Sequence, residues 1–136
     1  MFAAFPLLAL PVLIYNLIGF TGGAQRLTET LFSVHMASGA EWPVSAGDLL
    51  LSTSLVVLFV ELLKSTNSRR TAILNHGLSM LLFVVCLVEL LLAPAFATST
   101  FFLITLMVLL DVLAGFIVTI LAARRDVDLT AGGGVL

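Results

Sequence analysis

Charged residues are scarce in this sequence. Asp, Glu, Lys and Arg make up 10% of its 136 residues, against roughly 25% in an ordinary soluble domain. Hydrophobic residues make up 60% of the chain, and the mean hydropathy is +1.20. A soluble domain of this size cannot bury so much apolar surface, which excludes a water-soluble enzyme. Intrinsic disorder is excluded as well, because it requires low hydrophobicity and high charge.

Cysteine, histidine and basic residues are also few. Cys86 is the single cysteine, which excludes an internal disulfide and any paired-cysteine redox or zinc motif. With only His35 and His76 beside it, we expect no metal site and no cofactor. Six Lys and Arg and a net charge of −2 leave no basic surface for nucleic acid.

Four apolar runs approach the length of about 20 residues that a helix needs to cross a membrane. They cover about 3–20, 46–63, 72–93 and 100–123. The predicted fold is therefore all-α: an integral membrane four-helix bundle in one domain, 1–125, followed by a flexible C-terminal tail, 126–136. Pro11 lies inside the first run and predicts a kink there.

Residues at the ends of these runs are typical of helix boundaries. Ser45 and Asp48 fit a capping box at the start of the second helix. Pro94 predicts the end of the third helix, because the residue before a proline avoids the helical conformation. Thr98 or Ser99 is expected to cap the fourth helix.

The basic residues are distributed unevenly between the two sides of the predicted bundle. The first loop carries one, Arg26, and the third loop carries none. The second loop and the segment after the fourth run carry five: Lys64, Arg69, Arg70, Arg124 and Arg125. Cytoplasmic loops are enriched in Lys and Arg. We therefore expect a multi-pass protein in contact with lipid in a bacterial inner membrane, with both termini cytoplasmic.

The first loop, about 21–45, then lies outside the cytoplasm. Leu27, Leu31 and Val34 share one face at helical spacing, which predicts a short interfacial helix in this loop. Trp42, just before the second helix, and Tyr15, near the outer end of the first, are predicted to anchor the chain among lipid headgroups.

Asp111 lies about eleven residues from either end of the fourth run, where an acidic side chain cannot reach the membrane surface. Gly115 lies on the same helix face and would allow another helix to approach closely. Asp111 is therefore expected to face a helix rather than lipid. Two interpretations stay open: a carboxyl that joins helices by hydrogen bonds, and a site that binds a proton or a cation.

The third run carries a polar stripe that is expected to face the bundle, consisting of Asn75, Ser79, Cys86 and Glu89. It either buries hydrogen bonds between helices or lines a polar path. Counted from the loop that joins the second and third helices, Glu61 and His76 lie at similar depth in the membrane, which predicts contact between them. Lys64, three residues later, is an alternative partner for Glu61. Without either partner, the Glu61 side chain would extend to the membrane surface.

Three hypotheses follow for the function. The chain is expected to be a small, non-catalytic membrane subunit that packs against other integral membrane proteins or forms a homo-oligomer. The alternative is an oligomeric carrier or channel, coupled to protons or cations, that uses Asp111 and Glu89. An intramembrane enzyme built on Ser54, Ser79 and His76 is the third hypothesis, but no motif supports it, so we expect no enzyme.

Overall fold

The computed structural model describes residues 5–64 and 69–132, and this part of the chain forms four α-helices, two short 3₁₀ helices and one two-stranded sheet. The elements in order are α1 (Ala9–Phe20), η2 (Ala24–Thr28), β1 (Thr30–His35), β2 (Glu41–Ser45), α2 (Ala46–Lys64), α3 (Arg69–Leu92), η3 (Pro94–Phe96) and α4 (Ser99–Gly132).

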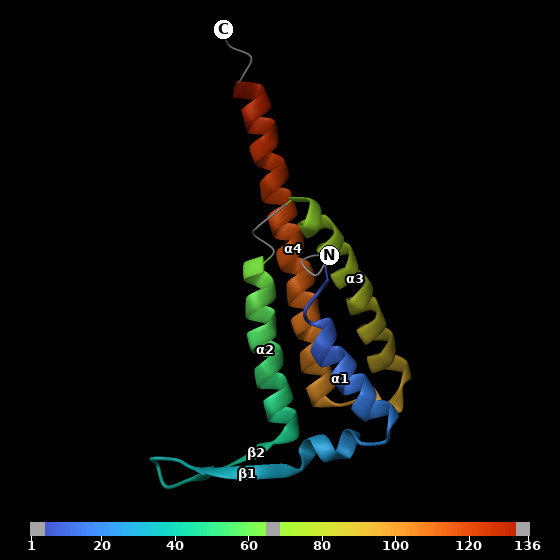
Figure 1. Ribbon diagram of the computed structural model, residues 1–136, viewed down its shortest axis with the longest axis vertical. Coiled ribbons are helices and arrows are strands. Elements are labelled where there is room, and N and C mark those ends of the chain that lie inside the picture. Colours follow the sequence, from blue (N-terminus) through green and yellow to red (C-terminus); the bar gives the residue numbers. More distant parts are fainter. Residues whose placement is uncertain (1–4, 65–68, 133–136) are drawn as a thin grey trace.

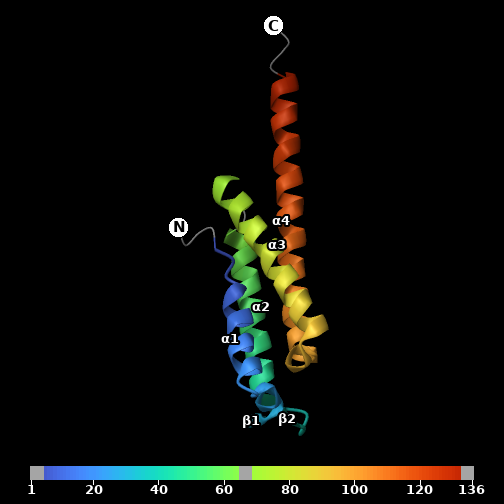
Figure 2. The ribbon, with the colours of Figure 1, turned by 90° about the vertical axis from the view of Figure 1, so that its right-hand side faces the viewer.

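Helix α4 is the element against which the other helices pack (Figure 1). Its most extensive contacts are with α3 and α2, and α1 also contacts both α4 and α2. Figure 1 shows α1 lying obliquely across the lower part of the bundle, and Figure 2 shows α3 lying obliquely to α4. The sheet lies beyond one end of the bundle, and α4 extends past α2 and α3 at the opposite end (Figure 1).

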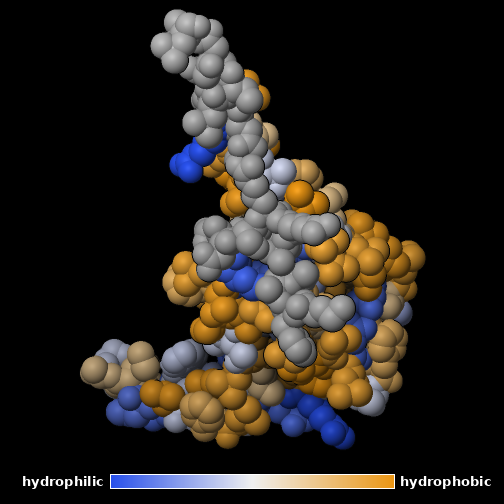
Figure 3. Space-filling model, turned by 45° about the horizontal axis from the view of Figure 1, so that its top comes forward, coloured by the Kyte–Doolittle hydropathy of each residue, from blue (hydrophilic) through white to orange (hydrophobic). Residues whose placement is uncertain are grey.

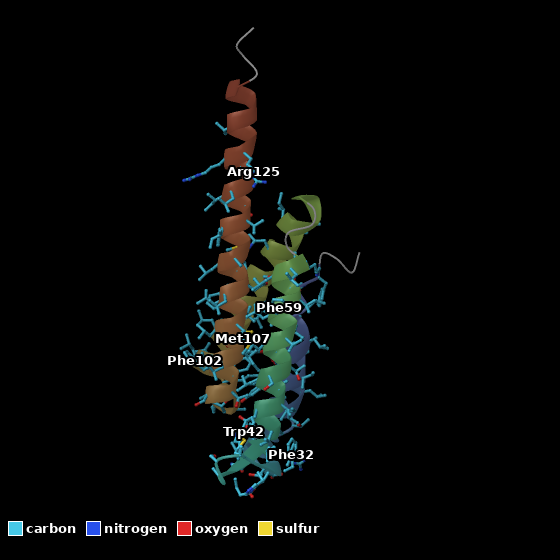
Figure 4. All side chains as sticks on the ribbon, turned by 90° about the vertical axis from the view of Figure 1, so that its left-hand side faces the viewer. Phe32, Trp42, Phe59, Phe102, Met107 and Arg125 are labelled. Atoms are coloured by element: carbon cyan, nitrogen blue, oxygen red, sulfur yellow. The ribbon has the colours of Figure 1, made fainter. Side chains whose placement is uncertain are left out.

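Among the described residues, three helices are long and apolar enough to cross a membrane: Ala46–Lys64, Ile73–Leu92 and Ser99–Arg125. The space-filling view shows hydrophobic residues covering most of the helix surface (Figure 3). Side chains such as Phe59 of α2 and Phe102 of α4 are more than half exposed there (Figure 4). This pattern is that of helices whose outer faces contact an apolar environment.

Helix α1 is shorter than the predicted span 3–20, because it begins only at Ala9. The residues before it form turns in which the N–H groups of Ala9 and Leu10 bond to the carbonyls of Pro6 and Leu7. Pro11 therefore lies in the first turn of α1, where a backbone N–H has no partner within the helix. The predicted kink within a longer helix does not arise.

The predicted helix boundaries hold at three places. Ser45 and Asp48 form a reciprocal capping box: the Asp48 carboxylate accepts from Ser45 N–H at 2.9 Å, and Asp48 N–H donates to Ser45 Oγ at 3.1 Å. Helix α3 ends at Leu92, two residues before Pro94. Thr98 Oγ1 accepts from the Phe101 N–H at 3.2 Å and caps α4.

Helix α4 continues well beyond its predicted end at 123. It runs to Gly132, a length of about 51 Å at 1.5 Å per residue. Residues 126–132, predicted to belong to a flexible tail, are therefore helical, and 133–136 lie outside the described residues. Figure 4 shows Arg125 on the projecting part of α4.

The first loop forms a β-hairpin where an interfacial helix was predicted. Strand β1 pairs antiparallel with β2, and Val34 lies opposite Trp42. The turn contains Gly39 at φ +84°, a conformation that favours glycine. The helical spacing of Leu27, Leu31 and Val34 was misleading, because polar and apolar residues also alternate from residue 32 to 35 and a turn residue follows.

Aromatic side chains fill the core near the hairpin end of the bundle. Tyr15, Phe96 and Phe101 are fully buried, with ring centroids 4.7–5.5 Å apart. The Tyr15 hydroxyl also bonds to the Thr98 hydroxyl. Tyr15 is therefore enclosed by protein, and the expectation that its side chain lies among lipid headgroups is corrected. Trp42, by contrast, is 53% exposed.

Candidate functional site

Glu61 joins three segments of the chain near the end of α2. Its side chain is fully buried. One carboxylate oxygen accepts a hydrogen bond from the Leu7 N–H at 2.8 Å, and the other accepts from Asn75 Nδ2 of α3 at 2.6 Å. Lys64 lies 3.6 Å from the carboxylate. A buried carboxylate with this many partners is held in one position, and so are its partners.

The contact predicted between Glu61 and His76 is wrong. Glu61 bonds instead to Asn75, the residue beside His76, and the ring nitrogens of His76 have no hydrogen-bond partner within the described chain. Adjacent residues on a helix point about 100° apart, so Asn75 faces α2 while the His76 ring packs on Phe116 of α4. The alternative pairing of Glu61 with Lys64 is present.

Glu61 and Lys64 satisfy the backbone that precedes α1. Lys64 Nζ donates to the Phe5 carbonyl oxygen at 2.7 Å, while Glu61 accepts from the Leu7 N–H. Pro6 lies between these two residues and has no N–H of its own. In an apolar environment, each unsatisfied backbone group costs several kcal/mol. The pair therefore allows a non-helical segment to lie against the apolar bundle.

Asp111 faces another helix, as predicted, and that helix is α3. Asp111 is almost completely buried and accepts a hydrogen bond from Ser79 Oγ at 2.6 Å. This bond joins α3 to α4. Beside it lies a small cavity of about 20 Å³, lined by Asn75, His76, Ser79, Asp111, Gly115, Val118 and Thr119.

The His76 ring of α3 packs directly against Gly115 of α4. A Cβ atom built there would overlap the Nδ1 atom of His76 and lie 3.1 Å from its Cγ. The ring also contacts Phe116 edge-on, with centroids 4.5 Å apart. Gly115 was predicted to allow close helix approach, and the His76 ring occupies the space that a larger residue would need.

The polar stripe on α3 faces the bundle. Asn75, Ser79 and Cys86 are buried, and Glu89 accepts a hydrogen bond from Asn16 of α1 at 3.1 Å. Glu89 lies ten residues after Ser79 on α3, which is about 15 Å along a helix. Glu89 and Asp111 therefore belong to two separate polar contacts at different depths.

Sequence reasoning missed three participants in these contacts. Asn16 was not among the predicted site residues, yet it bonds across helices to Glu89. The role of the Leu7 N–H could not be predicted from the Leu7 side chain, although Pro6 before it indicates a break in the helical hydrogen-bond pattern. Thr119 lines the cavity one helical turn after Gly115, a spacing that would have placed it on the Asp111 face.

Searches against protein-family models, curated proteins and solved structures found no match to this chain. Within residues 5–64 and 69–132, no group of three or more His, Cys, Asp or Glu side chains could hold a metal ion. The site is therefore a set of hydrogen-bonded polar contacts between apolar helices, and its chemistry is that of carboxyl, amide, hydroxyl and imidazole groups.

Replacing Glu61 tests whether it holds the N-terminal segment. Glu61→Ala leaves the Leu7 N–H and the Asn75 amide without their acceptor, and we expect the free energy of unfolding to fall by about 2–4 kcal/mol. Glu61→Gln is expected to cost less, because its amide still accepts one bond and Asn75 can rotate its own oxygen toward the new donor. Equilibrium unfolding in mixed micelles measures both.

Glu89→Ala is the matched control, since Glu89 accepts one hydrogen bond and is only partly buried. Loss of this hydrogen bond should lower the free energy of unfolding by about 0.6–1.7 kcal/mol. Equal losses for Glu61→Ala and Glu89→Ala would contradict a special role for Glu61.

Gly115→Ala tests the close approach of α3 and α4. The added methyl group overlaps the His76 ring, so we expect a loss of about 1–3 kcal/mol in the free energy of unfolding. Gly77→Ala on α3 is the control, because a Cβ there meets nothing within 4 Å. It should leave stability unchanged or raise it by up to about 1 kcal/mol. The same result for both substitutions would show that the contact at Gly115 does not limit packing.

Proposed function

We propose that the chain is a small, non-catalytic integral membrane subunit that packs against other membrane proteins or against a second copy of itself. The observation that carries this proposal is the hairpin β1–β2, which stands away from the helices (Figure 1). All six residues of β1 are exposed. A hairpin of two strands is marginally stable alone in water, so an exposed one is suited to being covered by a partner.

The hairpin has one apolar face and one polar face. Residues directly opposite each other in an antiparallel pair lie on the same face. Phe32 pairs with Val44 and Val34 with Trp42, which gives one apolar face on which Phe32, Val34 and Trp42 are exposed and Val44 is buried. His35 pairs with Glu41 on the other face, at 2.7 Å between Nδ1 and Oε1. An exposed apolar face beside a polar one is typical of an interaction surface.

The acidic groups of the helices support a structural role rather than catalysis. Glu61, Glu89 and Asp111 each accept a hydrogen bond from another segment of the chain. Ser79 donates to Asp111, and Ser54 donates to the carbonyl of Leu50 in its own helix. The acidic groups and Ser79 therefore join segments of the chain, Ser54 bonds within its own helix, and in the described part of the chain neither serine is paired with a histidine base.

The arrangement of the N-terminal segment supports four crossings, although α1 itself is short. Phe5 lies at the level of Lys64, the last residue of α2. Leu27, after α1, lies against Gly47 near the start of α2. Residues 5–27 thus extend along the whole of α2. We infer that this segment crosses the bilayer with α2, α3 and α4, and that both termini are cytoplasmic in a bacterial inner membrane, as the basic residues indicate.

Labelling from the two sides of the membrane tests this topology. In a Cys86→Ala background, Arg125→Cys and an N-terminal epitope tag should be reached only from the cytoplasmic side. Glu41→Cys in the hairpin should be labelled only from outside. Detection of the tag on the same side as Glu41→Cys would show that the first segment does not cross, and would leave three spans.

The assembly itself is tested by native mass spectrometry after extraction in mild detergent. We expect a fixed mass larger than one chain, made of several copies or of this chain with other subunits. Changing Phe32, Val34 and Trp42 together to serine should reduce that species at least about tenfold, the effect of about 1.4 kcal/mol.

The control pair is His35→Gln with Glu41→Gln, which changes the opposite face and should leave the assembly intact. A lone chain in the unsubstituted sample would contradict the proposal.

The competing hypothesis, a proton- or cation-coupled carrier, is favoured by one observation, the polar cavity beside Asp111. Flux through vesicles that contain only this chain, lost in Asp111→Asn, would support the carrier.

A further inference from the structure

The cavity between α3 and α4 contains more polar groups than the hydrogen bond between Ser79 and Asp111 requires. Asn75, His76 and Thr119 also line it. Among the described residues, the buried polar side-chain atoms without a hydrogen-bond partner are Asn75 Oδ1 and both ring nitrogens of His76. All three atoms therefore belong to residues that line one cavity.

Buried polar atoms are almost always hydrogen-bonded, to protein or to ordered water. The cavity volume of about 20 Å³ is sufficient for one water molecule, which needs two to four polar partners. Asn75 Oδ1 can only accept a hydrogen bond, whereas a neutral imidazole has one donor and one acceptor nitrogen. A water molecule makes up to four hydrogen bonds, so one water can donate to Asn75 and also bond to His76 and Asp111, which line the same cavity.

We propose that His76 and Asp111 form one coupled proton-binding pair, bridged by a water molecule in this cavity. A proton bound at either group can pass through the water to the other, which leaves a neutral pair in one state and an imidazolium beside a carboxylate in the other. Ser79 holds the Asp111 carboxyl toward the cavity. Phe116 and Gly115 hold the imidazole ring from the α4 side.

Two other charged groups lie beside this cavity, on α2. The Glu61 carboxylate accepts a hydrogen bond from Asn75, which lines the cavity, and Lys64 lies 3.6 Å from that carboxylate. The inference does not depend on the subunit role, because a proton-binding pair can regulate helix packing in an assembly or serve transport.

The test follows the protonation of each group separately. The chain has two histidines, so labelled imidazoles give two resolvable NMR signals, with His35 on the exposed hairpin as an internal reference. Infrared spectroscopy follows the Asp111 carboxyl, identified by its loss in Asp111→Asn. Binding couplings are reciprocal. We therefore expect Asp111→Asn to change the proton affinity of His76 about tenfold or more, and His76→Gln to change that of Asp111 by the same factor.

Glu89→Gln is the control, because Glu89 lies in a different polar contact on the same helix. It should leave both titrations unchanged, and His35 should titrate identically in every variant. A His76 titration that is the same in Asp111→Asn as in the unsubstituted protein would overturn the proposal.

The bridging water is tested without any substitution, in case a variant fails to fold. In the unsubstituted protein, magnetisation transfer from water to the His76 imidazole should be observed in lipid nanodiscs. Its absence, under conditions in which the same transfer is seen at His35, would also overturn the proposal.

Discussion

The fold depends on satisfying the backbone of a segment that cannot be helical. Pro6 and Pro11 delay the start of α1 to Ala9, so residues 5–8 lie against apolar helices without a complete hydrogen-bond pattern. Glu61 and Lys64, one turn apart on α2, supply the missing acceptor and donor. Because an unpaired backbone group is costly in an apolar environment, this pair decides where the N-terminal segment can lie.

The same carboxylate orients the rest of the bundle. Glu61 accepts from Asn75, which turns one face of α3 toward α2. The next residue, His76, then points to α4, where Gly115 leaves room for its ring. Ser79, one turn further along α3, meets Asp111. Each polar residue in this series thus restricts the rotation of a helix that apolar packing alone would leave loosely defined.

The sequence predicted the features that depend on composition and local spacing, and it failed where neighbouring elements decide. The three long helices follow from apolar runs, and Asp111 faces a helix because a carboxyl cannot face lipid. The predicted contact between Glu61 and His76 was wrong by one residue, because the depth of a residue in the membrane does not determine which way its side chain faces around the helix. The hairpin was missed because Leu27, Leu31 and Val34 also fit a helical face. Tyr15 is buried because Phe96 and Phe101, distant in sequence, enclose it.

The central claim is that Glu61 holds the N-terminal segment through the backbone of Leu7. Hydrogen exchange at the Leu7 amide in nanodiscs measures this bond most directly. The account predicts that this amide is protected as strongly as the amides of α1, and that it loses protection in Glu61→Ala while the amides of α2 keep theirs. A Leu7 amide that exchanges as fast as that of Ser38 in the hairpin turn, with Glu61 in place, would contradict it.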